Sequence, residues 1–179
     1  LGHEQPLYGL QYPGLDGQSE PLTSIETIAG EFLQHVRTVQ PAGPYYLAGL
    51  CFGGLVVYEM ACQLQKQGEQ IAVLILFDSF APDGVRLREG EVWQSDDAAD
   101  GELQIEHAIV TVPEQTEASS VEAWMEKVRD VNARALVEFR PKPYDGDVVL
   151  FYPTKRGKNW KKLIVDPLHG WKNFVSGTV

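Results

Sequence analysis

The most informative stretch of the sequence is residues 45–54, which read YYLAGLCFGG and join two different patterns. The apolar run 45–48 leads into it, and a helical pattern over 55–66 follows it. Between them lies Gly-x-Cys-x-Gly, centred on Cys51. Glycines around one nucleophilic side chain are typical of a tight strand-to-helix turn, where a Cβ at Gly49 or Gly53 would collide with the strand or the helix. We therefore predict a nucleophile elbow at Cys51; the alternative is a glycine-rich turn with a small buried cysteine.

Composition limits the classes of function. A chain of 179 residues, 44% of them hydrophobic, suits one domain with a single core. The formal net charge of −10 offers no basic surplus for phosphates, so no nucleic acid partner is expected. No apolar run approaches the roughly 18 residues that span a bilayer, so we expect no membrane partner. The first residues carry neither a leading methionine nor a basic n-region, which predicts a fragment without a signal peptide.

The two cysteines are not predicted to form a disulfide. Cys51 and Cys62 are eleven residues apart on one turn-and-helix unit, a separation of roughly 16 Å at helical rise. That exceeds the ~7 Å limit between the Cα atoms of a disulfide. Two free thiols suit the reducing cytoplasm, which is the predicted location. The sequence has no Cys/His cluster with zinc-ligand spacing, so no metal is predicted.

Periodicity predicts an alternation of strands and helices. A strand is expected at 7–12, and a helix capped by Thr23 or Ser24 follows it. The apolar run 71–77 is typical of a central parallel strand covered on both faces. The remaining expected elements are a helix at 55–66 ending at Gly68, a helix at 121–139, a strand at 148–152 and the start of a strand at 174–179. This order predicts a doubly wound α/β fold with a mostly parallel sheet flanked by helices.

The middle of the chain has a different character. Residues 83–120 show no core periodicity, and 85–101 are charged and weakly patterned. Together with the helix at 121–139, they predict a lid-like helical insertion over about 83–140. That insertion lies within one domain covering 1–179.

Asp78 is the second candidate for chemistry. It ends the apolar run 71–77, and a carboxylate at the carboxyl end of a parallel strand lies at the ligand-binding edge of the sheet. There it can orient a histidine that deprotonates a nucleophile. The alternative is an aspartate that caps the next helix. Cys51 and Asp78 together favour a hydrolase-type site.

No histidine in the chain fits the base of such a site well. Only His107 and His169 follow Asp78. His107 falls in the predicted insertion, which favours a surface or lid position. His169 is in the right chain order but does not follow a core strand, so it is a weak candidate for the base. His35 precedes Asp78 and is expected to be a partly exposed helix residue.

Four stretches together resemble a known family, the thioesterase domains that end nonribosomal peptide and polyketide synthetases. These domains have the α/β-hydrolase fold. The matching stretches are 6–15 (PLYGLQYPGL), 43–54 (GPYYLAGLCFGG), 73–79 (VLILFDS) and 144–151 (YDGDVVLF). The segment from Trp160 to Trp171 also fits, and residues 83–120 fall where the family carries a variable lid.

The resemblance implies roles for three residues. Cys51 aligns with the family nucleophile, which is usually serine, and Asp78 aligns with the triad acid. The backbone N–H of Phe52 aligns with one oxyanion-hole donor. The family's histidine would lie beyond Val179, and its other oxyanion donor would precede Leu1.

The resemblance also implies an incomplete sheet. In the α/β-hydrolase order, a strand preceding Leu1 lies between the 7–12 strand and the elbow strand, and the last strand would follow Val179. Without them the sheet has a central gap with unpaired backbone groups. We therefore expect these 179 residues to be catalytically incompetent and poorly folded in isolation.

The function implied for the complete domain is release of an acyl or peptidyl chain from a carrier protein, by hydrolysis or cyclisation, through a Cys51 acyl-enzyme. The phosphopantetheine arm belongs to the carrier partner, and no cofactor is bound directly. Thiols are more acidic and more nucleophilic than serine hydroxyls, and a thioester acyl-enzyme stays activated towards an internal nucleophile. Two alternatives stand beside this: a stand-alone editing thioesterase, and a non-catalytic carrier-docking module.

Overall fold

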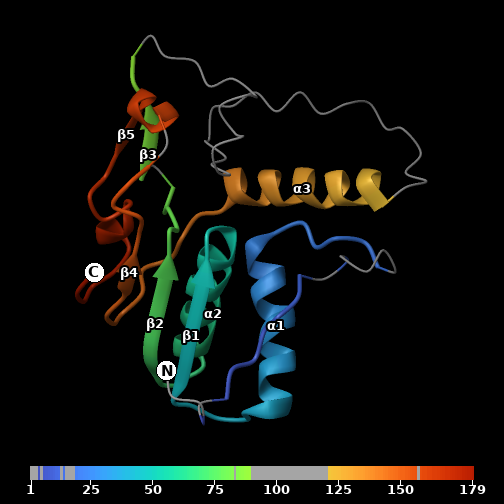
Figure 1. The fold of residues 1–179 in the computed structure, drawn as a ribbon. Coiled ribbons are helices and arrows are strands. Elements are labelled where there is room, and N and C mark those ends of the chain that lie inside the picture. The colour runs from blue at the N-terminus through green and yellow to red at the C-terminus, as the bar shows by residue number, and fades with distance from the viewer. Residues whose placement is uncertain are drawn as a thin grey trace.

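The computed structural model describes residues 4, 6–12, 14, 19–82, 84–89, 121–156 and 158–179. Within these residues a parallel sheet in the order β1-β2-β4 forms the centre of the fold (Figure 1). Its strands are β1 (Tyr45–Leu50), β2 (Ile71–Phe77) and β4 (Val149–Phe151). A second, antiparallel sheet pairs β3 (Val85–Leu87) with β5 (Leu163–Val165). These elements confirm the predicted α/β class with a mostly parallel sheet.

The helices begin and end close to the predicted positions. They are α1 (Ile25–Val39), α2 (Phe52–Lys66) and α3 (Val121–Glu138), with 3₁₀ helices η2 (Lys158–Lys162) and η3 (Trp171–Asn173). Ser24 caps α1 by accepting a hydrogen bond from the Thr27 N–H. Gly68 follows the end of α2 with a φ of 81°, the left-handed conformation that glycine adopts without strain.

The two faces of the parallel sheet are unequally covered. Helix α2 packs against β1 and β2, and α1 packs against α2, so Leu47, Leu74 and Leu76 are buried on that face. On the other face Tyr46 is 71% and Leu50 68% exposed. Both residues belong to β1; in β2 Phe77 on this face is 39% exposed, so the prediction that β2 is covered on both faces was wrong for the described residues. The reason is that α2, with α1 packed against it, covers only one side of the sheet.

The strand expected at 7–12 is absent: these residues have no strand partner, and Leu7 is largely exposed. A strand needs a neighbour to pair with, and β1 carries only β2 beside it in the described sheet. Tyr12 instead packs its ring edge-on against Phe52 and donates its hydroxyl to the Leu22 carbonyl. The carboxyl-terminal strand is only begun, as one bridge between Tyr144 and Val175.

Much of the predicted insertion at 83–140 falls on residues 90–120, which lie outside the described residues. Its described parts are strand β3 and helix α3. The sequence shows no core pattern at 85–101, yet Val85 packs with Leu163 in a small cluster between the two antiparallel strands. Such a pairing is non-local, so hydropathy within the segment did not indicate it. Figure 1 shows α3 above α1, to the side of the carboxyl ends of β1 and β2.

Candidate active site

The backbone at Cys51 has the strained conformation of a nucleophile elbow. Cys51 lies between β1 and α2 with φ 52° and ψ −120°, in the region of φ that L-residues rarely adopt. Its N–H donates to the Phe77 carbonyl at 2.8 Å. Its own carbonyl accepts from the Gly54 N–H at 3.0 Å and from Ser79 Oγ at 2.9 Å. These hydrogen bonds hold the turn, and the Cys51 side chain is exposed.

The glycines around the turn are not equally required. A Cβ on Gly49 would lie 2.2 Å from the Gly53 carbonyl oxygen, and one on Gly54 would lie 1.8 Å from Ser79 Oγ. A Cβ on Gly53 would meet no atom within 4 Å. The expectation of a collision was therefore right for Gly49 and wrong for Gly53. The difference arises because the Cβ direction at Gly53 is open, whereas that at Gly49 meets the backbone of the first turn of α2.

This contrast predicts the behaviour of two matched variants. Gly49→Ala should lower the free energy of unfolding by about 2 kcal/mol or more, because backbone atoms of α2 must move to admit the methyl group. Gly53→Ala should change it by less than about 1 kcal/mol, and in the stabilising direction, because alanine suits a helix better than glycine. Urea unfolding of the domain measures both. Equal losses in the two variants would contradict the geometry of the turn.

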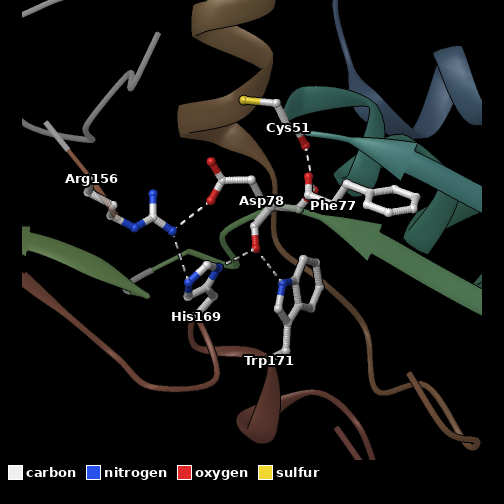
Figure 2. A network of polar contacts seen from close by, with 7 residues as sticks. Cys51, Phe77, Asp78, Arg156, His169 and Trp171 are labelled. Carbon is white, nitrogen blue, oxygen red and sulfur yellow. Dashed lines mark hydrogen bonds and ion pairs between the residues drawn. The ribbon is translucent and has the colours of Figure 1, made fainter. Parts of the chain in front are cut away.

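Asp78 lies at the same sheet edge as Cys51. It directly follows β2, with φ 45°, and its N–H donates to the Phe151 carbonyl of β4 at 2.6 Å. Its carboxylate oxygen Oδ1 accepts from Arg156 Nη2 at 2.7 Å (Figure 2). The register explains the proximity, because Leu50 and Phe77 pair, and Cys51 and Asp78 each follow one of them.

Phe52, the predicted oxyanion donor, is the first residue of α2. N–H groups in the first turn of a helix have no acceptor within the helix, and the helix dipole favours negative charge there. The Phe52 N–H is thus of the type that can stabilise an oxyanion next to Cys51.

His169 lies near this site but is not arranged as a base for Cys51. Its ring is 2% exposed and stacks on Phe80 at 4.0 Å between centroids. Nδ1 lies 3.2 Å from the Ser79 carbonyl, which can only accept, so Nδ1 carries the proton. Nε2 is then the acceptor facing Arg156 Nη2 at 3.4 Å. In Figure 2 the Asp78–Arg156 pair lies between the His169 ring and the Cys51 thiol.

Of the other histidines, His35 is the one among the described residues. His35 is an exposed residue of α1 that lies 3.4 Å from Glu31, as predicted for a helix histidine. His107 lies outside the described residues. The described residues contain no group of three or more His, Cys, Asp or Glu side chains that could hold a metal.

Arg156 is the residue of this site that the sequence analysis missed. The sequence shows only a basic run from Lys155 to Lys162 after β4, which reads as a solvated surface. In the structure Arg156 is largely buried, and its guanidinium lies 3.8 Å from the centroid of the Trp160 ring. An arginine four residues before a tryptophan was the only available signal.

The environment of His169 makes a prediction about its titration. Burial lowers the pKa of His169 from 6.5, and the positive charge of Arg156 lowers it further. The hydrogen bond to Ser79 acts in the opposite direction but does not cancel the effect of burial. Because the folded pKa lies below the unfolded one, the unfolded chain takes up the proton first as pH falls. His169 therefore contributes to stability above pH 6.5, and this contribution is lost as pH falls from 6.5 towards the folded pKa.

NMR titration of the His169 ring measures this directly. We expect a midpoint below 6.5 and ¹⁵N shifts of a neutral ring protonated at Nδ1. In Arg156→Ala the midpoint should rise, because one of the charges that disfavours the imidazolium is removed. A midpoint at or above 6.5 in the wild-type protein would contradict the described packing.

The two thiols differ strongly in their capacity for chemistry. Burial raises the pKa of Cys62 to about 12, and the thiol points to the Lys142 carbonyl at 3.9 Å. Cys62 is therefore a thiol at any physiological pH. Cys51, by contrast, is exposed at the start of α2, where a substrate can reach its sulfur.

Among the helices that the structure describes, none is long and apolar enough to cross a membrane.

Known proteins resemble the chain over its whole length. A family model described as "Thioesterase domain" matches residues 3–172. The chain is 32% identical over 184 residues to malpibaldin synthetase of Mortierella alpina, covering 100% of the chain and 3% of that protein. It therefore spans only a small part of this relative.

Solved structures share the fold. A four-domain nonribosomal peptide synthetase, holo-AB3403, matches with a TM-score of 0.64 and 24% identity, over 95% of this chain and 15% of that one. YbtT, a type II thioesterase from the yersiniabactin biosynthetic pathway, matches with a TM-score of 0.62 and 19% identity, over 95% and 69%. These structures agree with the α/β-hydrolase-type fold. Because the family model matches nearly the whole chain, the chain belongs to the thioesterase domain family.

Proposed function

We propose that the domain containing this chain releases an acyl or peptidyl chain from a carrier protein's phosphopantetheine thioester by way of an acyl-Cys51 intermediate. The observation that carries the proposal is the exposed Cys51 on a strained elbow, with Asp78 at the same sheet edge. Membership of the thioesterase family supports the reaction class.

The proposed reaction has two acyl transfers. The Cys51 thiolate attacks the thioester carbonyl, and the Phe52 N–H stabilises the oxyanion that forms. The bond to the phosphopantetheine sulfur then breaks, and that thiol leaves with a proton from the base. In the second step the base takes a proton from water or from an internal amine or hydroxyl, which attacks the acyl group, and Cys51 leaves as a thiolate.

The base is proposed to be a histidine outside these 179 residues, oriented by Asp78. Both ring nitrogens of His169 are engaged, Nδ1 with the Ser79 carbonyl and Nε2 with Arg156. A triad base needs one ring nitrogen for the acid and the other for the nucleophile. His169 would have to give up both contacts to serve, so the structure favours a support role for it.

The proposed partner is a carrier protein with its phosphopantetheine arm. No directly bound cofactor is proposed. Malpibaldin synthetase, of which the chain covers 3%, supports a domain joined to a larger synthetase. The similarity to YbtT, a type II thioesterase, supports the second candidate, a stand-alone thioesterase that clears misloaded carriers. Cys51 and Cys62 are not joined by a disulfide, which fits a reducing cytoplasm; that location remains a prediction.

Substitution of Cys51 by alanine tests the proposal in the full-length protein. With an acyl thioester of a phosphopantetheine mimic, Cys51→Ala should lower kcat at least 10³-fold, on the order found when a catalytic nucleophile is removed. Cys62→Ala is the matched control and should retain turnover, because that thiol is buried and protonated. Release that persists in Cys51→Ala would show that Cys51 is not the nucleophile and would contradict the acyl-Cys51 intermediate.

Cys51→Ser tests the choice of product. The cysteine acyl-enzyme is a thioester and stays activated, so it should favour attack by an internal nucleophile over hydrolysis. We expect the ratio of cyclic to linear product to fall in Cys51→Ser. Liquid chromatography of the products measures this ratio. Identical ratios in the wild type and in Cys51→Ser would count against a role for the thiol in cyclisation.

A further inference from the structure

Arg156 makes a directed contact with the proposed triad acid. Its Nη2 donates to Asp78 Oδ1 at 2.7 Å, a charge-assisted hydrogen bond. The Asp78 side chain is 34% exposed, so the contact leaves part of the carboxylate accessible. Asp78 follows β2 and Arg156 follows β4, so the ion pair joins the ends of two neighbouring strands.

Aromatic rings fix the guanidinium in place. Arg156 Cζ lies 3.8 Å from the centroid of Trp160 and 5.4 Å from that of Phe80. These rings attract the cation through their π faces and shield it from water. The Arg156 side chain is only 15% exposed. A surface arginine that samples many rotamers would not hold one carboxylate oxygen in this way.

His169 contacts both Arg156 and the backbone that follows Asp78. Its Nε2 accepts from the same Arg156 nitrogen at 3.4 Å, and its Nδ1–H donates to the carbonyl of Ser79, the residue after Asp78. Trp171 Nε1–H donates to the same carbonyl at 2.9 Å. The side chain of Asp78 and the backbone that follows it are therefore both held, one by Arg156 and the other by His169 and Trp171.

The direction of the Arg156–Asp78 contact indicates the role of Arg156. Figure 2 shows Arg156 approaching Asp78 on the side away from the Cys51 thiol, while the second carboxylate oxygen lies on the thiol's side. We propose that Arg156 is a positioning residue for the acyl-transfer reaction: it holds Asp78 by Oδ1 and leaves the other oxygen aimed at the base that serves Cys51. This inference rests on the proposed function, because it gives Asp78 the role of the triad acid.

Kinetics of the full-length protein separate positioning from substrate binding. Arg156→Ala should lower kcat by 10- to 100-fold, on the order expected for a misplaced catalytic group, with KM changed less than threefold. Guanidinium ion should restore part of the lost kcat by occupying the empty place. Arg156→Lys should restore less than wild-type kcat, because an ammonium lacks the planar geometry that fits between Asp78 and the rings.

Arg88→Ala is the matched control. Arg88 is exposed, and its Nε donates to the backbone carbonyl of Lys161, away from Asp78. This variant should keep wild-type kcat and show no response to guanidinium. A rise in KM with unchanged kcat in Arg156→Ala would make Arg156 a substrate-binding residue and overturn the proposal. A loss of kcat that guanidinium does not restore, in a variant that keeps its fold, would equally overturn it.

A measurement without turnover distinguishes this inference from the proposed function. The Arg156 guanidinium N–H protons should exchange with solvent at least tenfold faster in Asp78→Asn than in the wild-type protein. Equal rates would show that the ion pair does not hold, whatever the activity. If Cys51-dependent turnover is absent from the wild-type protein, the proposed function fails and the positioning role falls with it, although slow exchange would still establish the ion pair.

Discussion

The site depends on the strained backbone of Cys51. A φ of 52° in a residue with a Cβ costs on the order of 1–3 kcal/mol, and the surrounding hydrogen bonds must offset this cost. The Cys51 N–H is bound by the Phe77 carbonyl, and its own carbonyl receives Ser79 Oγ. Both partners belong to β2 or to the residues just after it. The conformation of the nucleophile is therefore set by the neighbouring strand and not by the turn alone.

The contacts between the elbow and the end of β2 also position Asp78, the proposed triad acid. Asp78 lies between Phe77 and Ser79, the two residues that hold the elbow, and it also has a positive φ, of 45°. Its N–H is held by the Phe151 carbonyl of β4. The ends of three parallel strands thus converge on one short segment. The Arg156 side chain, from the chain after β4, completes that segment by binding the Asp78 carboxylate.

The sequence predicted the parts of this site that follow from local pattern. Helical spacing gave α1 and α2 nearly to their ends, and the glycines around Cys51 predicted the elbow. It failed where the outcome depends on partners distant in the chain. Residues 7–12 look like a strand but have no neighbour to pair with, and β3 finds a partner about 80 residues away in β5. Arg156 acquires its role only through Asp78, which is 78 residues earlier, so the nearby Trp160 did not suffice to assign it.

The most direct measurement of the central claim is capture of the acyl group on the protein. Full-length protein is mixed with a carrier bearing an acyl thioester, quenched at short times with acid, digested and analysed by mass spectrometry. The account predicts the acyl mass on the peptide that contains Cys51 and none on the peptide that contains Cys62. An acyl group found on another residue, or turnover with no acyl-Cys51 at any time, would contradict it.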